Sequence, residues 1–151
     1  MIYPYAVQFL LALVASAGFG ILFNCPRREV LAGGICGGFA WFFYSWVYVV
    51  SMNELLGVFV GSVAVAVLSR IYSYRHMAPS IVFLIPGVIP LVPGALMYKT
   101  MKGVLELNIY DTFVEAVKAV QFAGLIAVAI VIVFSLPYSV FEIGKQKKIK
   151  K

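Results

Sequence analysis

Charged residues are scarce in this chain. They make up 12% of its 151 residues, whereas hydrophobic residues make up 63% and the mean hydropathy is +0.99. A soluble globular domain carries about a quarter charged residues, so the composition excludes an ordinary soluble fold. The net charge of +6 does not indicate nucleic-acid binding, because the basic residues lie in expected loops and in the tail. The length suits one domain, and that domain is expected to lie in a lipid bilayer.

Cysteine, histidine and acidic residues are also few. Cys25 and Cys36 fall at a loop edge and inside an apolar run, which suits neither a disulfide nor a metal site. The only histidine, His76, has no second ligand at metal-binding spacing and is expected in a solvated loop. Glu29 and Glu54 lie at the ends of apolar runs and are interpreted as helix caps or surface charges. The sequence has no Gly-x-Ser-x-Gly elbow or phosphate loop. We expect no enzyme activity, cofactor or metal.

Long uncharged runs dominate the rest of the chain. Most reach the ~20 residues that cross a hydrocarbon layer about 30 Å thick, and the short third run is extended by Arg70, whose side chain can snorkel to the interface. Capping boxes at Ser51–Glu54 and Thr112–Glu115 predict the starts of the third and last helices. The prediction is an all-α integral membrane protein with five transmembrane helices, at residues 3–24, 30–51, 54–72, 79–98 and 113–141, and a basic tail at 145–151.

The distribution of basic residues predicts the topology. An outer N-terminus and an inner C-terminus place nine of the twelve basic residues inside and three outside, as the positive-inside rule requires. If the fourth apolar segment entered and left on the same side, the best split would be seven against five. A fourth helix that is broken but crosses is therefore preferred. The outer residues in this topology are Lys99, Lys102 and Lys118.

The segment from Phe83 to Gly94 contains three prolines and two glycines within an uncharged stretch. Each interior proline removes a backbone donor, and carbonyls freed in hydrocarbon need other partners. Broken helices at membrane depth form transport sites, and their half-helix ends attract carboxylates. The alternative is a purely structural kink, and a polar residue at the end of the first span could equally be a helix cap. The predicted substrate path comprises Pro86, Gly87, Pro90, Pro93, Gly94 and Asn24.

Glycines four residues apart recur on the second and third expected spans. Such spacing lets helix backbones approach closely. These faces are interpreted either as packing within one bundle or as an interface with another subunit. The residues concerned are Gly33, Gly34, Gly37, Gly38, Gly57 and Gly61.

The run Ile85-Pro-Gly-Val-Ile-Pro-Leu-Val-Pro-Gly94, followed by Ala-Leu-Met-Tyr98, resembles the signature of the threonine/serine exporter family. The stretch Ala17–Glu29, with its Phe-Asn-Cys-Pro motif, resembles the first span and loop of the same family. The likeness covers nearly the whole chain and is that of the small, separately encoded subunit, which corresponds to the C-terminal membrane half of the fused exporters.

This resemblance implies a multi-pass protein of the inner (cytoplasmic) membrane that exports small carboxylate-bearing metabolites. The implied substrates are threonine and serine, or a dicarboxylate such as succinate. The resemblance also implies a larger membrane partner subunit, and a homo-oligomer stays open beside it. The alternative is a membrane scaffold or assembly subunit that does not itself transport.

Overall fold

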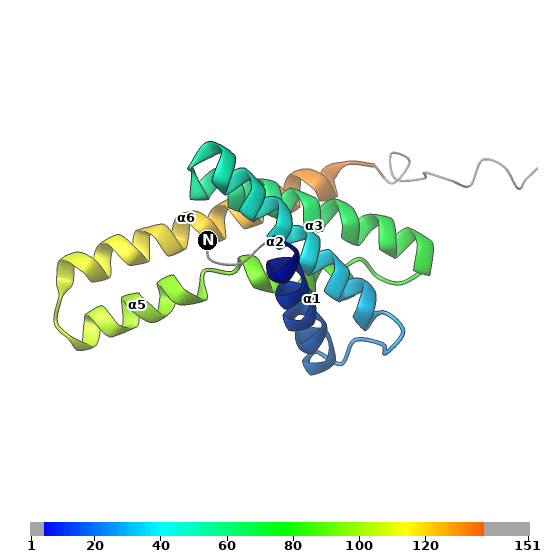
Figure 1. The fold of residues 1–151 in the computed structure, drawn as a ribbon, viewed down its shortest axis with the longest axis horizontal. Coiled ribbons are helices and arrows are strands. Elements are labelled where there is room, and N and C mark those ends of the chain that lie inside the picture. The colour runs from blue at the N-terminus through cyan, green and yellow to red at the C-terminus, as the bar shows by residue number, and fades with distance from the viewer. Residues whose placement is uncertain (1–4, 138–151) are drawn as a thin grey trace, which may run out of the picture.

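The computed structural model describes residues 5–137, and this part of the chain is helical without any strand (Figure 1). The expected basic tail at 145–151 and the last residues of the expected fifth span lie outside the described residues. In chain order the helices are α1 (Tyr5–Leu22), α2 (Val30–Ser51), α3 (Glu54–His76), α4 (Ile81–Val88), the 3-10 helix η1 (Ile89–Leu91), α5 (Gly94–Leu105) and α6 (Ile109–Ser135).

Four of these helices, α1, α2, α3 and α6, are long and apolar enough to cross a membrane. The segments Ile81–Leu91 and Gly94–Leu105 pass the same test when they are taken as one pair, and they are bent by 53°. The prediction of an all-helical membrane protein is thereby confirmed. The fifth crossing and the sides on which the termini lie stay predictions.

Helix α2 lies at the centre of the fold, because α1, α3 and α4 all pack against it. Its buried face, with Ala32, Cys36 and Ala40, meets Val65 of α3 and Phe83 of α4 in the main core cluster. Small side chains at these positions let the backbones approach closely, since packing rather than water exclusion holds helices together in lipid. This contact fixes α4, and with it the proline-rich segment, against the bundle.

The six glycines singled out in the sequence are all buried within this chain. A Cβ atom built on Gly34 would lie 3.0 Å from the carbonyl oxygen of Leu13, and one built on Gly61 would lie 2.8 Å from that of Ala40. A Cβ atom on Gly57 would lie 3.0 Å from Tyr44. Of the two interpretations offered above, packing within the bundle therefore accounts for the contacts of these glycines.

Gly37 offers the sharpest test of that packing. A Cβ atom there would collide with Ser16 Oγ of α1, which is fully buried. We expect Gly37→Ala to destabilise the fold by about 1–3 kcal/mol, as overpacked cores do. The matched control is Gly18→Ala in α1, where the added atom meets open space. This substitution should be neutral or slightly stabilising. Thermal unfolding in detergent measures both, and equal melting temperatures for the two variants would contradict the packing account.

Helices α5 and α6 form a hairpin that extends to one side of the other helices (Figure 1). The two helices approach closely at Gly103, where a Cβ atom would collide with Thr112 Oγ1. The turn between them uses Leu107 at φ 56°, and the side chain of Asn108 accepts a hydrogen bond from the amide of Asp111. The second half of α6 then returns along α3.

The two predicted capping boxes are wrong. Helix α3 is capped by Asn53, whose Oδ1 accepts hydrogen bonds from the amides of Leu55 at 3.0 Å and Leu56 at 3.4 Å. The hydroxyl of Ser51 instead donates to the Val47 carbonyl at the end of α2. Helix α6 begins at Ile109, so Thr112 lies inside its first turn. In both cases an asparagine occupies the N-cap position and its side chain accepts from free amides of the first turn. Ser51 and Thr112 do not occupy that position.

Arg70 does not snorkel, contrary to expectation. Its side chain is buried, with 3% relative exposure, between α3 and the end of α6. Nη1 donates hydrogen bonds to the carbonyls of Val133 at 2.7 Å and Leu136 at 2.5 Å, and the guanidinium lies over the ring of Phe134. The last carbonyls of a helix have no partners of their own, so Arg70 caps α6 and joins it to α3.

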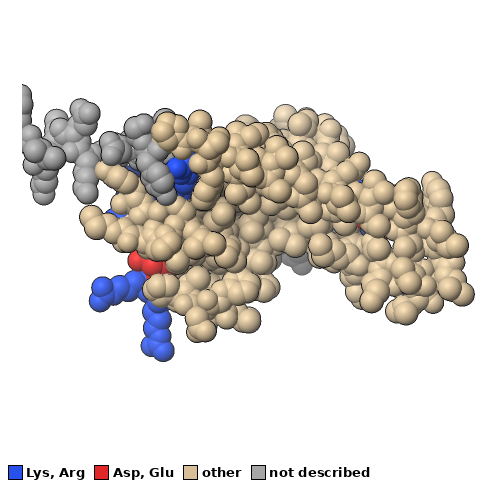
Figure 2. Space-filling model, turned by 180° about the vertical axis from the view of Figure 1, so that it is seen from behind, with Lys and Arg blue, Asp and Glu red and all other residues tan. Residues whose placement is uncertain are grey.

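Most of the molecular surface suits lipid. Figure 2 shows charged side chains gathered at one end of the face that it presents, while the long body of that face is almost free of them. Large apolar side chains are exposed along the helices, among them Leu11, Val14, Val50 and Val131. In water such a surface would mark an aggregation-prone or binding face, whereas in a bilayer it is the ordinary outer surface of a helix bundle.

Candidate functional site

The proline-rich segment interrupts the helix between α4 and α5. Pro86 lies inside α4 and has no backbone N–H, so it cannot donate the helical hydrogen bond that the Val82 carbonyl would otherwise accept. The thiol of Cys25, from the loop after α1, donates to that carbonyl at 3.6 Å. The carbonyl of Ile89, freed in the same way by Pro93, accepts from the amide of Val92 at 3.1 Å. The chain therefore supplies replacement donors for two of the carbonyls that its prolines release.

A hollow of about 330 Å³ lies where the helix is interrupted. This volume falls within the ~300–1,000 Å³ of typical small-molecule pockets. Side chains from α2, α3 and α6 face the interrupted backbone across it. Its lining comprises Trp41, Tyr44, Glu54, Val58, residues 90–96 and Phe122. We call it the break hollow.

The N-terminal end of α5 borders the break hollow. The amide of Gly94 donates to the Val92 carbonyl at 2.8 Å, and that of Met97 donates to the Pro93 carbonyl at 3.0 Å. Within residues 5–137, the amides of Ala95 and Leu96 have no backbone acceptor. Free amides at a helix N-terminus carry a partial positive charge and favour anions such as carboxylates.

The structure divides the predicted path residues among three places. Pro90, Pro93 and Gly94 line the break hollow. Pro86 and Gly87 are buried deeper in the bundle instead. A Cβ atom on Gly33 would lie 3.1 Å from the ring of Pro86, and one on Gly87 would lie 2.7 Å from Val65. These two residues shape the packing of α4 rather than the wall of the hollow.

Asn24 lies at a different hollow. It has φ 55°, follows the end of α1, and donates its amide to the Ile21 carbonyl at 3.0 Å, which is the geometry of a residue that ends a helix. Its exposed side chain borders a hollow of about 500 Å³ with Ile21, Cys25, Arg27 and Val30. Asn24 therefore does not meet the residues of the break hollow.

Glu29 and His76 form a close side-chain contact that the sequence interpretation missed. Their Oε2 and Nδ1 atoms lie 2.6 Å apart, and the Glu29 side chain is largely buried, at 12% exposure. The imidazole also packs against the rings of Tyr72 and Phe83. His76 is exposed, as expected of a solvated histidine, although it is the last residue of α3 rather than part of a loop. The sequence contained one indication of this contact: Glu29 precedes α2 and His76 ends α3, so two consecutive antiparallel helices place both residues at the same end.

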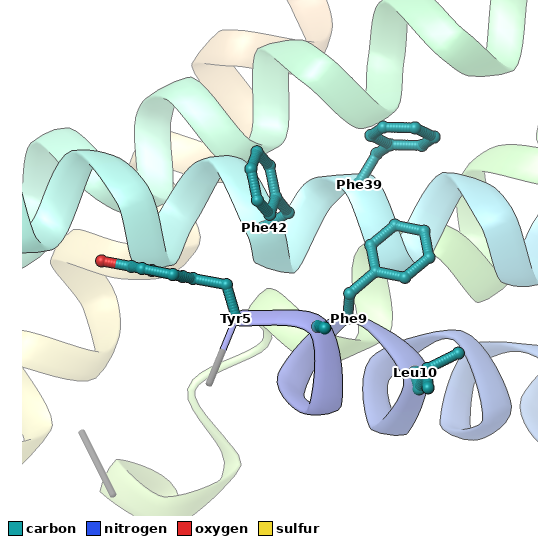
Figure 3. A pocket seen from close by; sticks show the side chains of 6 residues that line it. Tyr5, Phe9, Leu10, Phe39 and Phe42 are labelled. Carbon is teal, nitrogen blue, oxygen red and sulfur yellow. The ribbon is translucent and has the colours of Figure 1, made fainter. Parts of the chain in front are cut away.

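A third hollow, of about 480 Å³, lies between α1 and α2 and is shown in Figure 3. Aromatic rings from the two helices form its walls: Phe9 meets Phe39 edge-on with centroids 5.2 Å apart, and Tyr5 meets Phe42 at 6.2 Å. Its lining is apolar apart from the Tyr5 hydroxyl. Specific ligand sites need placed polar groups to orient the ligand, so we interpret this hollow as a lipid-facing groove.

Apolar helices of spanning length, together with a bent helix pair beside a hollow lined by one carboxylate and mostly apolar side chains, define a multi-pass membrane protein with an interrupted helix. The chain belongs to the threonine/serine exporter family, because residues 8–136 match the family described as "Threonine/Serine exporter, ThrE". That family is one of exporters, and the apolar helices of this chain fit a multi-pass membrane protein.

An uncharacterized protein of Haemophilus influenzae (strain ATCC 51907 / DSM 11121 / KW20 / Rd) is 22% identical over 101 residues. The aligned part covers 67% of this chain and 34% of that protein, so the chain spans about a third of the relative's length. No solved structure matches the chain.

Proposed function

We propose that this chain is a membrane subunit of a secondary exporter in the inner (cytoplasmic) membrane. Its substrates are small carboxylate-bearing metabolites, namely threonine and serine or a dicarboxylate such as succinate. The observation that carries the proposal is the break hollow, where free amides at the N-terminus of α5 face a space of small-molecule size. A substrate carboxylate takes the place of the missing backbone acceptors.

In this proposal the substrate path runs along the interrupted helix. Pro90, Pro93 and Gly94 line the part of the path where the substrate binds. Pro86 and Gly87 are buried and form the point about which α4 moves. Asn24 borders a separate hollow, which we assign to the inner end of this path. Alternating access then consists of α4 and α5 moving against the α1–α3 bundle, as in other transporters built around discontinuous helices.

We further propose that a larger membrane subunit completes the transporter. A unit with an odd number of crossings has its ends on opposite sides of the membrane, and joining a second such unit gives the inverted repeat common among secondary transporters. The greater length of the Haemophilus relative is compatible with this arrangement. A second copy of this chain is the other possible neighbour.

The direct test is export. Cells loaded with threonine, serine or succinate are compared with and without this chain, and each condition is repeated with a co-expressed larger family member. We expect faster efflux of at least one substrate when both chains are present. Unchanged efflux of all three, with the chain inserted and folded, would favour the scaffold alternative.

The proposed topology can be tested by labelling introduced cysteines in a Cys25→Ser, Cys36→Ala background. Pro79→Cys lies before α4, and Leu107→Cys lies at the exposed turn after α5. If the interrupted pair crosses the membrane, an impermeant maleimide added to intact cells should label position 107 but not position 79. Disrupted cells provide the control, in which both should react. Labelling of the two positions from the same side would instead show a re-entrant segment.

A further inference from the structure

Glu54 is the one charged side chain among the residues that line the break hollow. The other glutamates within residues 5–137 each lie close to a basic side chain. Glu29 contacts His76, Glu115 lies 3.9 Å from Lys99, and Glu106 lies 3.6 Å from Lys102. Within those same residues Glu54 has no basic partner. Glu54 is exposed at the start of α3, so its carboxylate borders the hollow, and the described residues supply no positive counterpart to it.

Two aromatic side chains of α2 line the same hollow as this carboxylate. The rings of Trp41 and Tyr44 are 5.0 Å apart, and Tyr44 in turn stacks on Tyr48. The indole N–H of Trp41 donates to Oε1 of Gln8 at 3.2 Å, and the same oxygen accepts from the buried Ser45 hydroxyl at 3.1 Å. Because its N–H is already engaged, Trp41 offers the hollow a π surface rather than a donor. Aromatic faces and a carboxylate together attract a cation.

We propose that Glu54, with Trp41 and Tyr44, binds the α-ammonium group of the substrate and makes the hollow selective for α-amino acids over dicarboxylates. This inference rests on the proposed function, which assigns the substrate carboxylate to the amides of α5. The two ends of the lining then match the two charges of a zwitterion. A dicarboxylate would place its second negative charge beside Glu54, where like charges repel.

The simpler account of Glu54 is structural, because an acidic residue in the first turn of α3 favours the helix dipole. The two accounts differ in what a substitution does to ligand selectivity. A helix-dipole role changes stability without regard to the ligand, whereas an ammonium-binding role changes affinity only for ligands that carry the amine.

The experiment compares two ligands that differ in that amine. L-threonine and 3-hydroxybutanoate share the carboxylate, the hydroxyl and the methyl group, and only threonine has the α-ammonium. Binding to the reconstituted full-length protein, with the larger subunit if it co-purifies, is followed by tryptophan fluorescence in a Trp46→Phe background. We expect the unmodified site to prefer threonine by about tenfold, the scale of one hydrogen bond to a charged group.

Glu54→Gln should remove this preference by weakening threonine about tenfold and leaving 3-hydroxybutanoate unchanged. Glu54→Asp should keep the preference, and Glu106→Gln, which removes a glutamate outside the hollow, should alter neither affinity. A preference that survives Glu54→Gln, or an equal loss for both ligands, would overturn the assignment while leaving the exporter proposal standing. Failure of the unmodified protein to bind either ligand would overturn the assignment together with the proposed substrate site.

Discussion

Replacing Pro90 and Pro93 together by alanine is expected to reduce export at least tenfold while the protein still inserts and folds. Alanine restores the amides that these positions lack and is the best helix former. Helix α4 can then continue through the segment that η1 and the extended Val92 now occupy. The 53° bend would relax and the N-terminus of α5 would disappear as a separate end. Both the anion-binding amides and the hollow depend on that end.

Two controls separate this effect from loss of protein. Pro26→Ala changes an exposed proline in the α1–α2 loop, away from the break hollow, and should leave export unchanged. Pro86→Ala restores a donor inside a segment that is already helical, so its main effect should be on stability through packing against α2. Export is divided by the amount of folded protein. Normal export per folded molecule in the double variant would remove the interrupted helix from the mechanism.

Arg70→Met is expected to cause the largest loss of stability among single substitutions in the described helices. Methionine keeps much of the length but leaves the carbonyls of Val133 and Leu136 without the guanidinium. A buried acceptor left unpaired costs about 1–3 kcal/mol. The bond to Val133 is buried and the bond to Leu136 is only partly buried, so a loss of roughly 2–4 kcal/mol follows. The end of α6 should separate from α3 before the rest of the bundle unfolds.

Arg75→Met is the matched control, because Arg75 belongs to the same helix but is exposed. Its effect should lie within about 0.5 kcal/mol, as for ordinary surface changes. Thermal unfolding in detergent compares the two, and Arg70→Lys should fall between them because lysine keeps the charge without the planar fork. Equal melting temperatures for Arg70→Met and Arg75→Met would show that the cap contributes nothing.

The class of the protein could be predicted from its apolar runs, because spanning a bilayer requires a length and a composition that are visible in one dimension. The second run, at 30–51, has the bounds of α2. The interruption near Pro93 could also be predicted, since proline acts on its own backbone and on the turn before it. Properties that depend on a residue's immediate neighbours are the ones that the sequence reveals.

The contacts of the site could not be predicted in this way. Arg70 reaches carbonyls of α6, Cys25 donates to a carbonyl of α4, and Glu29 meets His76. Each partner lies on another helix, so its identity depends on how the helices pack. The capping errors have a different cause: asparagines stood next to the true helix starts, and the more familiar serine and threonine patterns were preferred to them.

The most direct test of the central claim is whether substrate occupies the break hollow. Gly94→Cys in the Cys25→Ser, Cys36→Ala background places a thiol in the lining, where an added Cβ atom meets nothing within 4 Å. Leu107→Cys, in the exposed turn after α5 and outside the lining, is the control. We expect a water-soluble maleimide to label position 94, and we expect threonine, serine or succinate to slow this labelling without affecting position 107. Labelling at position 94 that none of the three substrates slows would contradict this claim.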